Sequence, residues 1–321
     1  MIVSGGDAPG INTALAAYTA LADRYGDQVV GAIGGFAGLL DGRLAPLTSD
    51  SVGPWAGQPG SMLPSSRDPV LSGSDARDRL AGVLRTHGID NLVMFGGDGS
   101  LRHIPPLLAA WGVPCIGLPT TIDNDVPGTE RTLGFDSACN YAYQAIDGAL
   151  ATGRALPGRI FMIETLGGHT GMLALAVAQG AGAHAVLVPE YRYDDAWLAR
   201  RLVDAVHRDG YALLVLSEGV AASRTLADDI PGWTGIRVRD TRLGHSQRGA
   251  RPSHIDRWLA AEMARLAHRA LRDGALRGMV VVRGGEAALY EGGLDGFPAQ
   301  VPDRAVYDFI NGIDPHEHSG N

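Results

Sequence analysis

Two segments, residues 93–100 and 118–125, contain the residue types that could carry chemistry in this sequence. Each begins as an apolar run and ends in a polar turn, so each should place its polar groups at the C-terminal edge of a buried strand. In open parallel α/β sheets, ligands bind at that edge. The first turn offers glycine amides and one carboxylate, and the second offers a hydroxyl and two carboxylates. A phosphate and magnesium site that faces an alcohol-activating base needs these groups.

A Gly-Gly-Asp turn between a strand and a helix is expected twice, at residues 5–7 and at residues 96–98. Glycines at such junctions let backbone N–H groups approach phosphate oxygens, and the start of the following helix adds partial positive charge. Asp98 is then a candidate Mg²⁺ ligand, because hard cations prefer oxygen ligands. The alternative is that Asp98 caps the helix.

The segment 121–125 contains two aspartates, Asp123 and Asp125, separated by Asn124. If the segment is extended, both carboxylates point the same way and Asn124 points the other way. Paired carboxylates suit a site in which one holds a metal and the other accepts a hydroxyl proton. The alternative is a turn rich in Asx residues before Pro127 and Gly128.

Composition restricts the chemistry, the partners and the compartment. All 27 basic residues are arginine, which excludes a Walker A loop and a Schiff-base mechanism, since both need lysine. The net charge of −8 disfavours nucleic acid and anionic membranes as partners. No apolar run approaches the roughly 18 residues of a membrane span, and Cys115 and Cys139 are too few for a disulfide framework. We therefore expect a cytoplasmic enzyme, with Cys115 buried in a strand.

Apolar runs alternate with amphipathic stretches, which is typical of βαβ units and predicts an α/β fold with mainly parallel sheets. Strands are expected at residues 1–4, 29–33, 92–95, 116–118, 160–163, 185–188, 212–216 and 279–282. The clearest helices are expected at residues 11–24, 137–150, 194–208 and 254–271. A span rich in Pro, Gly and Ser, residues 53–73, contains Arg67 and is typical of an active-site loop.

Six motifs occur in one order along nearly the whole chain. They are Gly5-Gly6-Asp7-Ala8-Pro9-Gly10, Gly96-Gly97-Asp98-Gly99-Ser100, Thr121-Ile122-Asp123-Asn124-Asp125, Gly158-Arg159-Ile160, Ser217-Glu218 and Gly244-His245-Ser246-Gln247-Arg248-Gly249. This set resembles the ordered motifs of the bacterial phosphofructokinase family. The resemblance implies two Rossmann-like α/β lobes with the active site in the cleft between them. It also implies transfer of the γ-phosphoryl group of ATP to the 1-hydroxyl of fructose 6-phosphate, a step of glycolysis.

The same resemblance implies which residues belong to each lobe. A nucleotide and magnesium lobe would comprise residues 1–134 and about 247–297, and a sugar-phosphate lobe residues 135–246 and about 298–321. In the first lobe Asp123 would be the base towards the sugar hydroxyl, with Thr121 and Asp125 beside it, and Arg67 would meet the transferring phosphate. The matches on the nucleotide and Mg²⁺ side are Gly6, Phe36, Arg67, Asp98, Gly99 and Ser100, with Asp98 holding the metal.

The matches on the sugar-phosphate side are Thr121, Asp123, Asp125, Arg159, Leu166, Gly167, Glu218, Arg239, His245 and Arg248. Among them Glu218 would contact sugar hydroxyls. Arg159, Arg239, His245 and Arg248 would contact the 6-phosphate, which a planar guanidinium can bind through two hydrogen bonds. In the family, Arg159 and Arg239 reach in from the neighbouring subunit, so a homodimer or homotetramer is expected.

In this family, the residues at two positions indicate whether the phosphoryl donor is ATP or pyrophosphate. Users of pyrophosphate have an aspartate at the position of Gly99 and a lysine at the position of Thr120. Gly99 leaves room for a nucleotide, and Thr120 supplies no charge, so ATP is the expected donor. A second hypothesis is a pyrophosphate-dependent or specialised sugar-phosphate kinase. It is favoured by Thr120, by His103 and by Gly168, which replaces an arginine of the family. A third hypothesis is a non-catalytic subunit, against which the presence of Asp123 argues.

Overall fold

The computed structural model describes residues 1–67 and 69–314. Two units make up this part of the chain. The first comprises Met1–Ser137 and Arg248–Ala299, and the second comprises Ala138–Gln247 and the chain from Gln300 onward. Residues 315–321 of the expected second lobe lie outside the described residues. Each unit has its own main sheet, with two apolar cores in the first unit and one in the second, and the α/β fold with mainly parallel sheets is confirmed.

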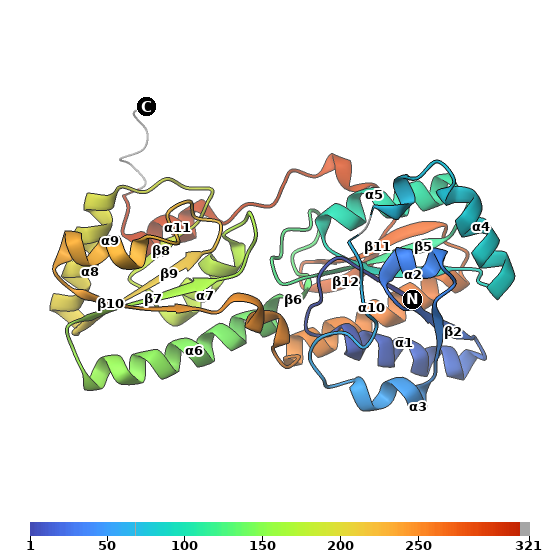
Figure 1. The fold of residues 1–321 in the computed structure, drawn as a ribbon, viewed down its shortest axis with the longest axis horizontal. Coiled ribbons are helices and arrows are strands. Elements are labelled where there is room, and N and C mark those ends of the chain that lie inside the picture. Colours follow the sequence, from blue (N-terminus) through green and yellow to red (C-terminus); the bar gives the residue numbers. More distant parts are fainter. Residues whose placement is uncertain (68, 315–321) are drawn as a thin grey trace. The chain divides into compact units, whose positions relative to one another are not determined.

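The sheet of the first unit has the strand order β1-β4-β5-β11-β12, and β6 pairs with β5 beside this path. Figure 1 labels β5, β6, β11 and β12 of this sheet. All neighbours are parallel except β11 and β12. The strands are β1 (Ile2–Ser4), β4 (Leu92–Gly96), β5 (Cys115–Thr121), β6 (Leu133–Gly134), β11 (Arg277–Arg283) and β12 (Glu286–Tyr290). Every residue of β4 and β5, including Cys115, is buried, because helices cover both faces of this sheet. A separate antiparallel hairpin joins β2 (Val29–Ala32) to β3 (Leu44–Leu47).

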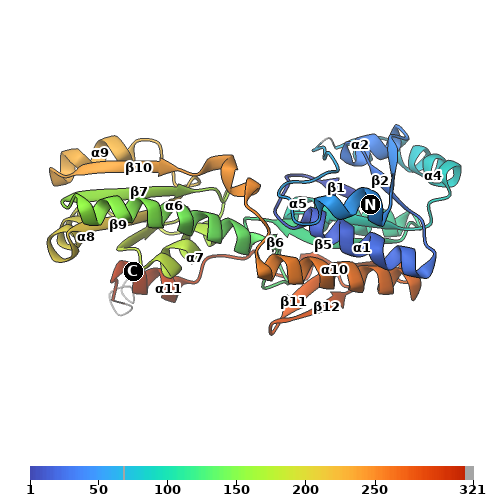
Figure 2. The ribbon, with the colours of Figure 1, turned by 90° about the horizontal axis from the view of Figure 1, so that it is seen from below.

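Alternate side chains of β4 enter two different cores of the first unit. Val93 and Phe95 pack in the core that includes residues of α1 and α10, which lie side by side (Figure 2). Leu92 and Met94 pack in the core that includes residues of α2, α4 and α5. This alternation follows from the two-residue period of a strand. The helices are α1 (Ile11–Tyr25), α2 (Gly35–Leu40), α3 (Ser49–Val52), α4 (Ala76–His87), α5 (Asp98–Ala110) and α10 (His254–Arg272), with short 3₁₀ turns η1 (Gly53–Trp55), η2 (Val70–Ser72) and η4 (Leu294–Gly296).

The second unit has a wholly parallel sheet with the order β10-β7-β9-β8. Its strands are β7 (Arg159–Thr165), β8 (Ala185–Leu187), β9 (Tyr211–Ser217) and β10 (Arg237–Arg242). Apolar side chains of α8 and α9 pack on β7 and β9 in one core, while α7 packs on β9 and β8. The helices are α7 (Met172–Ala181), α8 (Asp195–Asp209), α9 (Leu226–Thr234) and α11 (Arg304–Asn311). Helix α6 (Phe135–Ala155) begins in the first unit and continues into the second, and the 3₁₀ turn η3 (Gly244–Gly249) brings the chain back.

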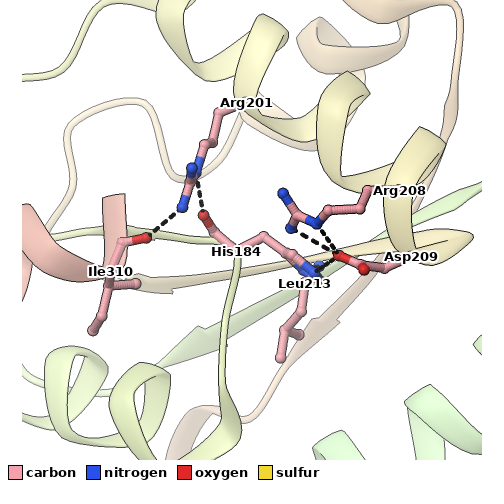
Figure 3. A network of polar contacts seen from close by, with 6 residues as sticks. All are labelled: His184, Arg201, Arg208, Asp209, Leu213 and Ile310. Atoms are coloured by element: carbon pink, nitrogen blue, oxygen red, sulfur yellow. Dashed lines mark hydrogen bonds and ion pairs between the residues drawn. The ribbon is translucent and has the colours of Figure 1, made fainter. Parts of the chain in front are cut away.

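Polar side chains attach the C-terminal helix α11 to the rest of the second unit. Arg201 on α8 donates one hydrogen bond to the carbonyl of His184 and another to the carbonyl of Ile310, both at 2.8 Å (Figure 3). The side chain of Asn311 accepts from the N–H of Val186 at 2.9 Å and donates to its carbonyl at 3.0 Å. A buried amide side chain therefore pairs with strand β8 as a neighbouring strand would.

Crossing a membrane requires a helix that is both long and apolar, and the helices of residues 1–67 and 69–314 do not meet this requirement.

Candidate active site

A pocket of about 390 Å³ lies at the C-terminal edge of the sheet of the first unit. The segments that follow β1, β4 and β5 all contribute to it, because parallel strands end at the same edge. The pocket therefore brings together Asp98, Thr121, Asp123, Asp125 and glycines of both Gly-Gly-Asp turns, as expected from the sequence. The lining residues are Ser4, Gly5, Gly6, Arg67, Pro69, Gly97, Asp98, Gly99, Ser100, Ile104, Thr120, Thr121, Asp123, Asp125 and Arg248.

Three carboxylates line this pocket, those of Asp98, Asp123 and Asp125. Burial raises the pKa of Asp125 to about 6, and the negative charges of Asp123 and Asp98 contribute to the same shift. The Oδ1 atom of Asp125 is buried and has no hydrogen-bond partner among the described residues. A buried carboxylate oxygen beside further negative charges creates a demand for a cation.

The expectation that residues 121–125 are extended is wrong. Strand β5 ends at Thr121, and Asn124 has a left-handed backbone with φ 51°. The Asn124 side chain stabilises this conformation, because it accepts from the N–H of Thr132 at 2.8 Å and donates to the carbonyl of Glu130 at 3.2 Å. The chain therefore leaves the extended conformation at Asn124, and both neighbouring aspartates still line the pocket. The N–H of Asp123 donates to Oγ1 of Thr121 at 3.1 Å, which ties this residue to the end of the strand.

Asp98 does not cap helix α5, since Gly97 occupies the N-cap position and Asp98 is the first helical residue. Its Oδ1 atom instead forms an ion pair of 2.9 Å with Arg102, one turn further along the helix. Arg102 also lies 3.8 Å from Asp295. This ion pair was not predicted from the sequence, although an acidic and a basic residue four positions apart on a helix commonly pair.

Two guanidinium groups lie beside the first glycine turn. A Cβ atom at Gly6 would stand 2.6 Å from Nη1 of Arg248 and 3.4 Å from Nη2 of Arg67, so only glycine leaves this arrangement undisturbed. Nη1 of Arg248 also donates to the carbonyl of Asp7 at 3.1 Å. Positive charge therefore gathers at the β1 side of the pocket, while the carboxylates come from the ends of β4 and β5.

A smaller cavity of about 130 Å³ shares Ser4, Pro69 and Ile104 with the main pocket. It contains Phe36, which is buried, and His103, which is exposed. Its remaining lining residues are Ser66, Leu71, Ser72 and Leu107. Apolar walls with a few hydroxyls suit an uncharged ring better than a phosphate.

The residues present fit a magnesium ion. No group of three or more His, Cys, Asp or Glu side chains in residues 1–67 and 69–314 is arranged to hold a metal without help. Mg²⁺ does not require such a group, because it commonly binds one or two carboxylates together with substrate phosphates and water. Asp98 and the unpartnered Oδ1 of Asp125 supply suitable hard oxygen ligands in a pocket that also has anion-binding groups.

In the second unit, several expected residues follow the C-terminal ends of strands. Leu166 and Gly167 follow β7, Glu218 follows β9, and His245 comes shortly after β10. Oε1 of Glu218 accepts a hydrogen bond from the N–H of Gly168 at 3.0 Å. Gly167 has φ 153°, and a Cβ there would lie 2.5 Å from the carbonyl oxygen of Thr170, so this tight turn requires glycine.

Arg159 and Arg239 are not brought to that edge. Arg159 is the first residue of β7, and the turn at Leu166 follows the last. At about 3.3 Å per residue the strand separates them by about 20 Å. Arg239, which is exposed, lies in the adjacent strand opposite Phe161, the third residue of β7. By the same rise per residue, Arg239 lies about 16 Å before the turn at Leu166, so both arginines begin away from the edge where Leu166 and Glu218 lie.

Comparisons with known proteins agree on one family. Residues 1–271 match the family model described as phosphofructokinase. The chain is 34% identical to ATP-dependent 6-phosphofructokinase 1 of Clostridium perfringens over 98% of both chains. It is 38% identical to the ATP-dependent 6-phosphofructokinase of Vibrio parahaemolyticus over 85% of both chains.

Solved structures show the same fold. Phosphofructokinase from Saccharomyces cerevisiae superposes with a TM-score of 0.80 at 27% identity over 90% of this chain, which spans 44% of the yeast chain. A pyrophosphate-dependent phosphofructokinase from Marinobacter aquaeolei gives a TM-score of 0.82 at 22% identity and covers 97% of this chain and 90% of its own, a likeness of fold. Together with the matches in sequence, these likenesses establish that the chain belongs to the phosphofructokinase family.

Proposed function

We propose that this protein is an ATP-dependent 6-phosphofructokinase, which transfers the γ-phosphoryl group of ATP to the 1-hydroxyl of fructose 6-phosphate. The observation that carries the proposal is the pocket in which Asp98, Asp123 and Asp125 lie with two arginines and a glycine turn. Carboxylates for a metal and a base, together with cations and amides for phosphate, are the requirements of phosphoryl transfer. Relatives of nearly full coverage carry the name of this activity.

Asp123 acts as the base in this proposal. It takes the proton of the sugar hydroxyl while the hydroxyl oxygen forms a bond to the γ-phosphorus, and the bond from that phosphorus to the bridging oxygen of ATP breaks with its electron pair leaving on ADP. The hydrogen bond from the Asp123 amide to Thr121 supports this role, because it fixes the backbone of the base against the end of strand β5. Arg67 binds the transferring group.

Asp98 and Asp125 would hold Mg²⁺ in the proposed site. When bound with ATP, the ion neutralises charge on the phosphates. The amides of Gly6, Gly99 and Ser100 would contact phosphate oxygens. The cavity that contains Phe36 would receive the nucleoside, and the open space at Gly99, where a Cβ would meet no atom within 4 Å, supports a nucleotide as the donor.

The sugar phosphate would bind at the C-terminal edge of the sheet in the second unit. Glu218 and the turn at Leu166 and Gly167 would contact the sugar, and His245 would contact its 6-phosphate. We propose that Arg159 and Arg239 complete the phosphate site of a neighbouring copy in a homodimer or homotetramer. The positions of Arg159 and Arg239 support this proposal, because they lie about 20 Å and about 16 Å along the strands from the turn at Leu166.

A coupled assay of the purified protein tests the proposed function. ATP and then pyrophosphate, each with Mg²⁺, would be offered with fructose 6-phosphate and a panel of other sugar phosphates. We expect turnover with ATP and fructose 6-phosphate. Turnover only with pyrophosphate would replace the donor, turnover only with another sugar would replace the acceptor, and no turnover with any pair would leave a non-catalytic subunit.

A further inference from the structure

The guanidinium group of Arg102 lies between two carboxylates of the first unit. Its Nη2 is 2.9 Å from Oδ1 of Asp98, and its Nη1 is 3.8 Å from Oδ1 of Asp295. Asp98 is the first residue of α5, Arg102 follows one helical turn later, and Asp295 belongs to the 3₁₀ turn η4. Asp98 lines the pocket, whereas the side chain of Asp295 is 89% exposed. One guanidinium group therefore faces a carboxylate of the candidate site with one end and a carboxylate in solvent with the other.

The ion pair compensates part of the negative charge of the pocket. Three aspartates line this pocket, and the charge of Asp98 contributes to the raised pKa of Asp125. Arg67 and Arg248 lie beside Gly6, on the β1 side. Arg102 contributes positive charge on the opposite side, in direct contact with Asp98. It thus lies at the carboxylate that is a candidate ligand of the metal.

A guanidinium group and a divalent cation compete for one carboxylate oxygen, because both use its lone pairs and because like charges repel. The side chains of Arg102 and Asp98 are partly exposed, and ion pairs of this kind contribute little to stability. The pair can therefore open at small cost when another cation binds Asp98. Asp295 is a second partner within reach, since Nη1 of Arg102 already lies 3.8 Å from it.

We infer that Arg102 competes with the divalent cation for Asp98 and lowers the affinity of the site for that cation, while Asp295 holds the guanidinium group when the metal is bound. The inference rests on the metal site of the proposed kinase. It makes the phosphates of the nucleotide necessary for tight binding of the metal, because they supply the oxygen ligands and the negative charge that the pair with Arg102 withholds. The metal then binds together with ATP and not ahead of it.

A merely structural role of Arg102 makes the opposite prediction. If the ion pair served to orient Asp98 towards the metal, its removal would weaken metal binding, as the loss of a residue that orients a ligand usually does. If Arg102 competes with the metal, its removal strengthens metal binding. The direction of the change in metal affinity separates the two roles without any measurement of turnover.

Helix α4 provides a matched control for this ion pair. Arg79 lies 3.9 Å from Asp75, four residues earlier in the chain, and 3.5 Å from Asp41. This repeats the arrangement of one arginine between two aspartates. The side chains of Asp41, Asp75 and Arg79 are all exposed, and these three residues are not part of the pocket lining. A change at Arg79 therefore removes the same kind of ion pair without altering the candidate site.

The test measures the binding of Mn²⁺, which prefers the same oxygen ligands as Mg²⁺, to the full chain without nucleotide. The electron paramagnetic resonance signal of the free ion gives the dissociation constant for the unmodified chain, Arg102→Met and Arg79→Met. In Arg102→Met we expect the dissociation constant to decrease about fivefold, as for removal of one partly screened charge near a divalent ion. Arg79→Met should bind as the unmodified chain does. An unchanged or increased dissociation constant in Arg102→Met would overturn the inference, and so would an equal decrease in both variants.

Asp295→Asn supplies a second variant, at an exposed position. Arg102 then loses its alternative partner, so the dissociation constant of Mn²⁺ should increase about twofold. When Asp295→Asn is combined with Arg102→Met, this increase should disappear, because no guanidinium group remains to be held. An increase of the same size in both backgrounds would contradict the role of Asp295.

The remaining outcomes separate the inference from the proposed function. Absence of Mn²⁺ binding in every variant would overturn the competition between Arg102 and the metal. Absence of turnover of the unmodified chain in the coupled assay would overturn the proposed function, and the affinities for Mn²⁺ would still decide the role of Arg102.

Discussion

Nδ1 of His184 accepts a hydrogen bond from the N–H of Leu213 at 2.8 Å, and its Nε2 lies 3.1 Å from Asp209 (Figure 3). A nitrogen that accepts cannot carry a proton, so the imidazole is neutral in the fold. Burial lowers the pKa of His184, and the nearby Arg208 and Arg201 act in the same direction, while Asp209 opposes them. The ring of Tyr211 packs against its edge.

We expect the free energy of unfolding to decrease as the pH falls below the ordinary histidine pKa. The unfolded chain then binds a proton at residue 184 that the folded chain does not bind, whereas above that pKa the contribution of this residue is complete. Urea unfolding at about pH 7.5 and about pH 5.5 measures the difference. His184→Asn keeps an acceptor for the N–H of Leu213 without a titrating ring and should reduce that difference. His207→Asn, on the exposed side of α8, should not, and an equal pH dependence in all three proteins would disprove the role of His184.

Asp123→Asn should lower kcat by about 10²- to 10⁴-fold, the usual contribution of a general base. The affinity for fructose 6-phosphate should change little, because a base acts chiefly in the transition state. Steady-state kinetics and calorimetry measure the two quantities. Asp90→Asn, an exposed change before strand β4, is the control and should behave as the unmodified chain. Loss of sugar binding in step with kcat would indicate a structural aspartate.

Mixing two inactive variants tests the proposed sharing of sites between copies. Arg239→Ala and Asp123→Ala would each be inactive alone, but a mixed dimer would contain one site with both residues intact. Random mixing should therefore restore up to about a quarter of the activity. The stoichiometry of the mixed species, measured by native mass spectrometry, is the control. Mixed oligomers without any recovered activity would show that Arg239 serves its own chain.

Asp256→Ala should destabilise the first unit by about 2–5 kcal/mol, because it leaves buried donors without an acceptor. The Asp256 carboxylate is 1% exposed and accepts from the N–H groups of Gly134 and Ser137, each at 2.9 Å, and from the Ser137 hydroxyl. It thereby holds the start of helix α6 against α10. Denaturant unfolding measures the loss, and Asp273→Ala at the exposed end of α10 should stay within about 0.5 kcal/mol of the unmodified chain. A loss of similar size in both variants would contradict this role.

Local patterns of the sequence were sufficient to predict the strands whose ends form the candidate site. Strands β4 and β5 are buried on both faces and read as continuous apolar runs, and helix α6, expected from residue 137, begins at Phe135. Strand β10 was not expected, because its residues Arg237–Arg242 are mostly charged and exposed at the edge of the sheet. The antiparallel pairing of β12 was not expected either, since pairing direction depends on partners distant in the chain.

The local sequence pattern also did not predict the backbone conformation of residues 121–125. Alternating aspartates are compatible with a strand, yet the side chain of Asn124 finds partners at Glu130 and Thr132 and turns the backbone. These hydrogen bonds to residues further along the chain hold Asn124 in a left-handed conformation. Both aspartates nevertheless line the pocket.

The sequence by itself determined that Gly-Gly-Asp turns and paired aspartates follow buried parallel strands, because apolar runs and strand direction place the ends of such strands at one edge of a sheet. Only the tertiary structure decided which arginines meet those groups. Arg67 comes from an irregular segment and Arg248 from a distant 3₁₀ turn, and both lie beside Gly6. Flexible side chains on irregular backbone have no period in the sequence, so their meeting point depends on the packing of the whole unit.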